Sequence, residues 1–278
     1  ADIVVNTGNA ESFATTAPAN PWFPIGNFKG TFDGQGHTVS GIYLKTDAAY
    51  AGFFSKTTKE STVKNLKIKN SYFESTIKDE MAAFGSVAGQ MGGVLDTVYS
   101  DAIVVGYGKQ IGGLIGRVNH GALINYKMTN CWFDGSVNVH NTTAAISYVG
   151  GLTGGLIQGY LDMDNCLNTG SVTYTFDKLP TQKDGSTHYI GTHVGGILGG
   201  VMNGTKYNAD KTIKAVSEWN VSNTMNAGLV TSGMKDGAAM PNGSTFANGA
   251  GSLFGYSTSG TINIKENVYV TSESCKTR

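Results

Sequence analysis

"QIGGLIGRV" (110–118), "YVGGLTGGL" (148–156) and "HVGGILGGV" (193–201) are three versions of one pattern: an apolar residue, Gly-Gly, two variable residues and Gly. Shorter versions of its core are "GFFS" from Gly52, "SVAG" from Ser86 and "SLFG" from Ser252, so the core occurs six times. Successive copies start 34, 27, 38, 45 and 56 residues apart. Self-similarity at this spacing indicates a solenoid, in which each unit buries its apolar face by stacking on its neighbours.

The segments between the cores are typical of short strands. They are "STVKNLKIKNSYF", "GVLDTVYSDAIVV", "MTNCWFDGSVNV", "MDNCLNTGSVTY", "EWNVSNTMNAGLV" and "GTINIKENVYVTS". Val, Ile, Tyr and Thr alternate in them with polar residues, which indicates half-buried strands, and no segment has a sustained apolar stripe of helical period. We therefore predict an all-β fold: a single right-handed parallel β-helix (β-solenoid) with irregular loop insertions. Its handedness follows from the usual chirality of parallel crossovers, and a coil length of about 25 residues predicts roughly ten coils.

The chain divides unequally along this solenoid. Residues 1–23, which contain Pro18 and Pro21, are predicted to form a capping segment before the first coil, and residues 24–278 the repeat domain. The uneven spacing of the cores predicts outward loops near 175–192, 202–216 and 232–249. Loops on a rigid scaffold are where binding specificity usually lies.

Composition excludes several classes of partner. The 278 residues contain 20 Lys plus Arg and 20 Asp plus Glu, and only 14% of them are charged. This balance argues against binding of nucleic acid, which requires a basic face, and no apolar run approaches the roughly 18 residues of a membrane span. The three cysteines match no zinc motif. We predict no cofactor, no metal, no nucleic acid and no membrane insertion.

The stretch "PIGNFKGTFDGQGHTVSGIYL" (24–44) holds Asp33 and His37 among five glycines. Catalysis would require one of them to meet a second acid, base or metal ligand in a cleft. In an extended turn, however, side chains four residues apart do not face each other. The turn "DGQG" instead predicts a structural corner, with Asp33 bonded to nearby backbone amides and His37 at the edge of the core.

The cores resemble the GLUG repeat of bacterial surface and secreted proteins. "GLIG" (113–116) matches the repeat in full, "GLTG" has Thr153 at its third position and "GILG" has Ile197 at its second. The resemblance spans about residues 20–275 and implies a β-solenoid at the cell surface or outside the cell. Similar repeats occur in the N-terminal regions of M26 IgA-specific metallopeptidases. Their zinc motif, His-Glu-x-x-His, is absent, because no two of the five histidines have that spacing.

Four residues are candidates for ligand binding. Asp162 and Asp164 in "YLDMDNC" lie two residues apart and so share a strand face, where they could bind calcium or cleave a glycosidic bond, or simply be solvated. Trp132 and Trp219 could stack on sugar rings, or pack in the core. Cys131 and Cys166 each follow an Asn in successive copies. We expect them to form an inward, reduced ladder, with Asn130 and Asn165 forming a ladder in the neighbouring turn.

These patterns favour a non-catalytic extracellular module of adhesin-like character. It would recognise a glycan or a host protein, or present another domain, as a monomer or as part of a longer chain. One alternative is a polysaccharide lyase or glycoside hydrolase on a β-helix, which predicts converging acidic and basic residues on one face. Another is an M26-type peptidase-associated region without its own zinc site. No catalytic residue is assigned.

Overall fold

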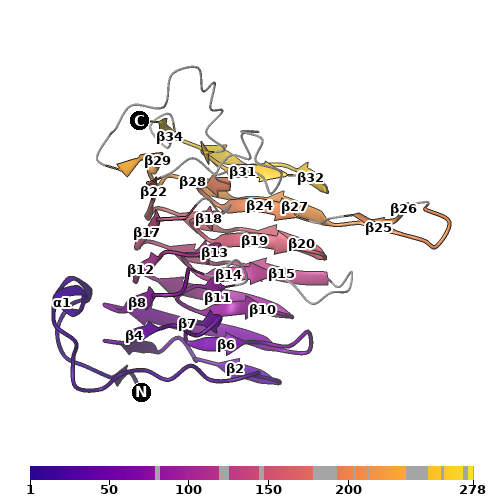
Figure 1. Ribbon diagram of the computed structural model, residues 1–278. Helices are drawn as coiled ribbons and strands as arrows, with labels where there is room; N and C mark the ends of the chain where they lie inside the picture. The colour runs from indigo at the N-terminus through magenta and orange to yellow at the C-terminus, as the bar shows by residue number, and fades with distance from the viewer. Residues whose placement is uncertain are drawn as a thin grey trace.

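The computed structural model describes residues 1–78, 82–118, 125–143, 147–177, 193–202, 205–211, 213–235, 250–257, 260–271 and 275–277. In it the chain winds through four stacks of parallel strands, from the N-terminus at one end of the molecule to the C-terminal strands at the other (Figure 1). The predicted all-β parallel solenoid is therefore confirmed. We number the four sheets 1 to 4 in the order in which one coil crosses them.

Sheet 1 is the widest, because it consists of two rows of stacked strands joined by a turn in each coil. The long strands β7 (Thr62–Lys69) and β11 (Val94–Ser100) run through this turn and so belong to both rows. Its members are β1 (Ile3–Val4), β2 (Thr31–Asp33), β3 (Thr38–Ser40), β7 (Thr62–Lys69), β11 (Val94–Ser100), β15 (Asn125–Thr129), β16 (Trp132–Phe133), β20 (Tyr160–Asp164), β21 (Leu167–Asn168), β27 (Glu218–Ser222), β28 (Met225–Asn226), β32 (Thr261–Ile264) and β33 (Tyr269–Val270).

The other three sheets follow in order along each coil. Sheet 2 contains β4 (Tyr43–Thr46), β8 (Tyr72–Ser75), β12 (Ile103–Gly106), β17 (Ser136–Asn141), β22 (Ser171–Phe176), β29 (Val230–Met234) and β34 (Cys275–Thr277). Sheet 3 contains β5 (Tyr50–Ala51), β9 (Ala83–Phe84), β13 (Gln110–Gly112), β18 (Tyr148–Gly150), β23 (His193–Gly195) and β30 (Ala250–Gly251). Sheet 4 contains β6 (Phe54–Lys56), β10 (Ala88–Met91), β14 (Ile115–Val118), β19 (Thr153–Ile157), β24 (Leu198–Met202) and β31 (Phe254–Ser257).

The described residues cross the first row of sheet 1 seven times, in β2, β7, β11, β15, β20, β27 and β32. The prediction of roughly ten coils is thus wrong. Equivalent positions at 31, 62, 94, 127 and 162 give 31 to 35 residues per coil. A coil is longer than assumed because it crosses four sheets, and sheet 1 twice.

The six glycine cores are structurally equivalent. Their third residues are paired from coil to coil in sheet 4, in the order Phe54, Ala88, Ile115, Thr153, Leu198 and Phe254. Each core forms the bend between sheets 3 and 4, and in the four cores that begin with glycine a side chain at that position would strike the next coil. A Cβ atom on Gly113 would lie 2.1 Å from the carbonyl oxygen of Gly151. At these four positions glycine allows the two backbones to approach closely, whereas Ser86 and Ser252 occupy the same position in the other two cores.

The interior is filled by apolar ladders. In sheet 2, alternate residues point inward and stack from coil to coil in the order Leu44, Phe73, Val104, Val137, Val172 and Val230, all of them buried. Period-2 alternation places these side chains on one face of each strand. Stacking of like positions then joins them in one continuous core.

The predicted Cys and Asn ladders are confirmed. Cys131 and Cys166 are free, buried and at equivalent positions, and burial raises the pKa of the Cys131 thiol. In the adjoining turn the Asn165 amide donates to Asn130 Oδ1 at 2.7 Å. Both asparagines have left-handed backbones, with φ of 55° and 51°. Asn tolerates this conformation better than most residues, which explains its recurrence at this turn.

The N-terminal segment lies against the first coil. Strand β1 pairs with β3. Asn9 is the N-cap of helix α1 (Ala10–Thr15), and its side chain accepts a hydrogen bond from the Ser12 amide at 2.8 Å. The Trp22 ring stacks on Phe53 at 4.7 Å between centroids. These contacts cover apolar surface at the start of the solenoid. The division between residues 23 and 24 stays a prediction.

One predicted insertion lies within the described residues. The strands β25 (Thr205–Tyr207) and β26 (Ile213–Val216) form an antiparallel hairpin between sheets 4 and 1, and this hairpin projects from the stack (Figure 1). It accounts for the growth near 202–216. Most residues of the two insertions expected near 175–192 and 232–249 lie outside the described residues.

Candidate functional site

The two candidate tryptophans occupy opposite environments. Trp219 in β27 is fully buried, and its ring packs against Phe254 at 6.1 Å between centroids. Trp132 in β16 is 40% exposed, its Nε1 donates to Thr169 Oγ1 at 2.7 Å, and its ring meets Tyr99 edge-on at 5.0 Å. Of the two, Trp132 alone presents a ring to solvent. Because two contacts hold that ring, it offers a fixed stacking platform.

Asp162 and Asp164 point outward from β20, as their spacing predicts, into a polar ladder. Asp162 accepts a hydrogen bond from Asn220 at 2.9 Å. Asp164 accepts from Ser222 and Asn223, both at 2.7 Å, and these bonds hold its pKa below its usual value. Hydrogen bonds to the charged form stabilise it. The pair is therefore engaged with neighbouring coils, and the described residues contain no group of three His, Cys, Asp or Glu side chains placed to hold a metal.

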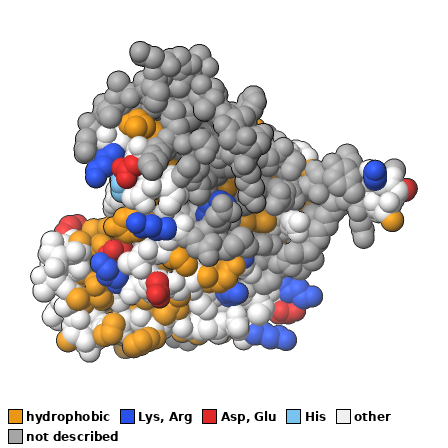
Figure 2. Space-filling model, viewed as in Figure 1, with side chains coloured by type: hydrophobic (Ala, Val, Ile, Leu, Met, Phe, Trp, Pro, Cys, Tyr) orange, Lys and Arg blue, Asp and Glu red, His pale blue; other side chains and the backbone are white. Residues whose placement is uncertain are grey.

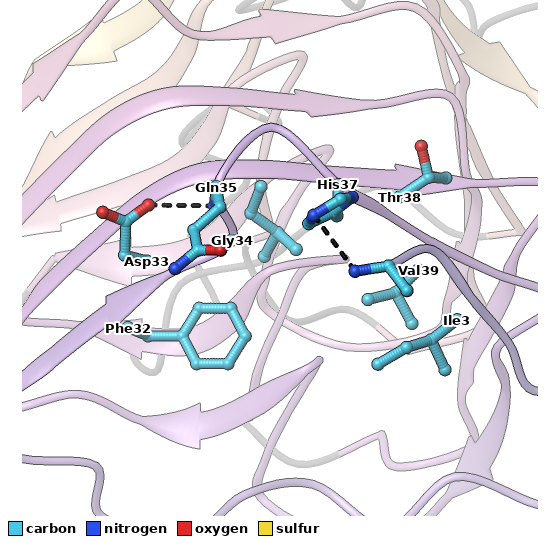
Figure 3. Close-up of a pocket in the computed structure, with 10 residues that line it drawn as sticks. Ile3, Phe32, Asp33, Gly34, Gln35, His37, Thr38 and Val39 are labelled. Atoms are coloured by element: carbon cyan, nitrogen blue, oxygen red, sulfur yellow. Dashed lines mark hydrogen bonds between the residues drawn. The ribbon is translucent and has the colours of Figure 1, made fainter.

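The corner at residues 33–37 borders a pocket of about 280 Å³ at the N-terminal end of the solenoid (Figure 3). As predicted, Asp33 accepts from a nearby backbone amide, that of Gln35 at 2.9 Å, and also from the Asn65 side chain. His37 differs from the prediction: its side chain is 46% exposed and lies 3.3 Å from Asp2 instead of packing at the core edge. Figure 3 shows Asp33 and His37 pointing apart, so they do not form a catalytic pair.

Trp132 belongs to a longer feature, which we call the sheet 1 stripe. The residues at its position in successive coils are Tyr99, Trp132, Leu167, Met225 and Tyr269. The chain neighbours of the first four are buried on both sides, so these side chains point outward, and Tyr269 is itself 59% exposed. With about 4.8 Å between paired strands, the stripe runs about 14 Å from Trp132 to Tyr269 along the solenoid.

Polar side chains border the stripe on one side. The turn asparagines lie there, with Asn130 donating to Asp96 at 2.8 Å, and Asn267 donating to Asn223 at 2.8 Å. Asn130, Asn223 and Asn267 are exposed, and each amide nitrogen carries a second hydrogen and each carbonyl a second lone pair beyond the bonds of the ladder. The border therefore supplies hydrogen-bonding groups parallel to the apolar row.

The opposite border contains charged groups. Asp101 and Asp134 hold equivalent positions on adjacent coils, two residues after Tyr99 and Trp132 in the chain. Burial raises the pKa of Asp101, although the Asn70 amide donates to it at 2.7 Å. Burial also raises the pKa of Tyr99 to about 12, with the neighbouring Asp101 charge adding to the effect. Beside Tyr99 and Trp132 the apolar row therefore lies between an amide border and an acidic border, and a narrow ligand can be held there on both sides. At Leu167 and Met225 the equivalent positions of the second border are Thr169 and Ala227.

Sequence reasoning found Trp132 and missed the other four residues of the stripe. A signal was present, because the stripe residue comes two positions after the residue in the left-handed turn: "NCW", "NCL", "NTM" and "NVY". Trp219 also had a signal. In "EWNVS" it has the same parity as Val221, and so the same inward direction.

Two further observations concern the helices and the surface charges of the described residues. Helix α1 has six residues, and no helix in the described ranges has the length and apolar character of a membrane span. On the face seen in Figure 2, basic and acidic side chains are interspersed among the described residues.

Comparison of the chain with models of protein families, with curated proteins and with solved structures found no match.

Proposed function

We propose that the protein is a non-catalytic recognition module that binds an extended polysaccharide along the sheet 1 stripe. The observation that carries this proposal is the single row of outward apolar and aromatic side chains from Tyr99 to Tyr269, bordered by hydrogen-bonding groups. Apolar faces of sugar rings stack on aromatic side chains, while sugar hydroxyls require hydrogen-bonding partners beside them. One row of this kind fits one sugar chain.

A protein partner fits this surface less well. Stable protein interfaces bury about 800 Å² on each side and have an apolar centre several residues wide. The stripe is one side chain wide, and Asn130 and Asp134 lie immediately beside Trp132. We therefore commit to a glycan ligand, and a protein ligand becomes an outcome of the test.

A location outside the cell or at its surface belongs to the same proposal. It is supported by the resemblance of "GLIG" (113–116) and its companion cores to GLUG repeats, and by the low charged fraction of 14%. The absence of His-Glu-x-x-His favours a module without peptidase chemistry over a peptidase of the M26 type.

The test is binding of the purified chain to an array of polysaccharides, compared with the variants Trp132→Ala and Phe23→Ala. Phe23 is 81% exposed and lies in the N-terminal segment, so its variant controls for loss of an exposed aromatic ring. We expect saturable binding to related glycans, about tenfold weaker in Trp132→Ala because a stacked ring contributes on the order of 1 kcal/mol, and unchanged in Phe23→Ala. A folded chain that binds no glycan, or binds equally as Trp132→Ala, contradicts the proposal.

A second function, glycoside cleavage, is favoured by Asp101 and Asp134. Retaining glycosidases use two carboxyl groups about 5–5.5 Å apart, one of them with a raised pKa. The two residues stack on adjacent coils beside Trp132, and the Asp101 pKa is raised by burial. If the protein cleaves glycosides, incubation with a bound polysaccharide would release new reducing ends, and both Asp101→Asn and Asp134→Asn would abolish their release. Binding without new reducing ends leaves recognition alone.

A further inference from the structure

Sheets 3 and 4 meet in a corner whose outward side chains contact each other. From sheet 3 the outward row includes Gln110, Tyr148 and His193, which pair from coil to coil. From sheet 4 it includes Gln90, Arg117, Gly155 and Gly200. We call this region the 3–4 corner. It lies on different sheets from the stripe, so a role for the corner is independent of the proposed glycan function.

Arg117 brings a positive charge into this corner, and no carboxylate of the described residues pairs with it. Its side chain is buried, with 5% of the residue exposed, and every hydrogen-bond partner within the described residues is neutral. By contrast, the buried carboxylate Glu74 is paired with Lys45 at 3.0 Å. Burial lowers the pKa of Arg117, but a guanidinium remains charged in proteins. A buried charge is costly unless it is paired.

The guanidinium also has donors to spare. Nε and Nη2 donate to Gln90 Oε1 at 2.9 and 2.7 Å, and Nη2 also donates to the Tyr50 hydroxyl. Nη1 has one contact within the described ranges, to Gln110 Oε1 at 3.5 Å, the limit of a hydrogen bond. Since each terminal nitrogen carries two hydrogens, Nη1 can donate to another acceptor.

The position beside Arg117 in the next coil leaves room for one. Gly155 lies there and carries no side chain, whereas a Cβ atom on Gly200, one coil farther, would lie 2.6 Å from the carbonyl oxygen of Tyr256. A Cβ atom on Gly155 would be 3.7 Å from Gln110 and 3.8 Å from Tyr148, ordinary contact distances. Space for a methyl-sized group is therefore available at Gly155, in the coil that follows Arg117.

A second buried polar group faces the same corner. His193 is fully buried, and neither of its ring nitrogens has a hydrogen-bond partner in the described part of the chain. Its ring packs against Tyr148 and Tyr256, each at 4.5 Å between centroids. Burial lowers its pKa to about 3, so near neutral pH the ring is uncharged and offers one donor and one acceptor. Unsatisfied buried polar groups of this kind require an explanation, such as a bound ligand.

We propose that the 3–4 corner binds a monocarboxylate, with Arg117 Nη1 as its charge-assisted donor. One buried positive charge surrounded by neutral amides and hydroxyls is neutralised by one negative charge. A divalent anion would leave a net negative charge buried, which is as unfavourable as the present positive one. Tyr148 lies beside the space at Gly155, where it can contact the rest of the ligand, and the His193 ring packs on Tyr148 one coil farther.

The chain contains only two arginines, Arg117 and Arg278, which makes the test direct. The full chain, labelled with ¹⁵N-arginine, is titrated at constant ionic strength with acetate, glucuronate, glucose, sulfate and chloride, and the Nε–H signals are followed by NMR. We expect a saturable shift of the Arg117 signal with acetate or glucuronate, none with glucose, and none for Arg278. No saturable shift with either carboxylate overturns the proposal, as does a tighter response to sulfate or chloride.

Variants provide a second test. Arg117→Gln should weaken carboxylate binding at least tenfold, measured by calorimetry, while Lys64→Gln should leave it unchanged. Lys64 is a matched control, because it is a cation whose ion pair with Asp33 lies on sheet 1. Equal affinity in Arg117→Gln contradicts the proposal. If Arg117→Gln does not fold, the titration of the unaltered chain still decides the question.

Discussion

Two glycines of the stretch "GGLTGG" (150–155), Gly151 and Gly155, should respond in opposite ways to alanine. A Cβ atom on Gly151 would lie 2.0 Å from the Gly196 carbonyl oxygen and 2.5 Å from Asn168 Nδ2. On Gly155 the nearest atoms are 3.7 to 4.0 Å away. Neither glycine has a left-handed φ, so the two variants isolate the close approach of neighbouring coils from backbone strain.

The structure sets the size of the difference. Gly151→Ala must displace the backbone of the next coil, and overpacking of this kind costs about 1–3 kcal/mol or more. The displacement also weakens ladder bonds such as Leu152 N to Ile197 O at 3.1 Å, each of which contributes about 1 kcal/mol. We expect Gly151→Ala to lower the free energy of unfolding by about 4 kcal/mol. Gly155→Ala should raise it by about 0.4–1 kcal/mol through the unfolded state.

Urea unfolding followed by circular dichroism measures both changes. Thermal unfolding provides a second measurement, because for a chain of this size a change of 1 kcal/mol in the free energy of unfolding corresponds to about 2–4 °C in Tm. The Tm of Gly151→Ala should therefore lie about 8–16 °C below that of the unaltered protein. Similar melting of the two variants would refute the assignment of the first core glycine to a backbone contact between coils. A strongly destabilised Gly155→Ala would refute the open space at the 3–4 corner.

Three other perturbations have defined outcomes. Tyr269→Ala should weaken the binding of oligosaccharides that span the roughly 14 Å from Trp132 about tenfold, and should leave the affinity for shorter oligosaccharides unchanged. Calorimetry measures both affinities, and equal losses for both lengths would rule out a binding site that extends to Tyr269. Asp164 has a lowered folded pKa, so its stabilisation is present above the unfolded pKa near 3.8 and is lost as the pH falls through the folded value. Asp164→Asn should therefore flatten acid unfolding below about pH 4, and an unchanged acid profile would contradict this origin. Cys131 and Cys166 should resist iodoacetamide at pH 8 in the folded chain and react in urea, measured by peptide mass spectrometry; rapid labelling of either in the folded chain would show that the ladder is open.

Much of the fold could be predicted from the sequence, because a solenoid repeats its contacts along with its residues. The cores at Gly113, Gly151 and Gly196 predicted stacked bends, and even the degenerate copies at Gly52, Ser86 and Ser252 stack in register. The number of coils was not predicted correctly, because it was taken from a general coil length of about 25 residues. The first spacings between cores, 34, 27 and 38 residues, are closer to the observed 31 to 35 residues per coil.

The candidate site was predictable only in part. Trp132 was identified, but the stripe depends on which residues of distant coils stack, and Tyr269 lies 137 positions from Trp132 in the chain. Arg117 had a recognisable signal, since it takes the place of a glycine in "GGLTGG" and "GGILGG". Its burial among neutral partners in the described part of the chain could not be predicted, because these partners are Gln90, Gln110 and Tyr50 from three different strands.

Recognition of a glycan by the sheet 1 stripe can be decided from the indole signals of the three tryptophans. The ¹⁵N-labelled chain is titrated with the best-binding oligosaccharide, and the Nε1–H signals of Trp22, Trp132 and Trp219 are followed by NMR. We expect a saturable shift of the Trp132 signal, with the buried Trp219 unchanged. Saturable binding that leaves Trp132 unshifted would contradict recognition at the stripe and would place the ligand elsewhere on the solenoid.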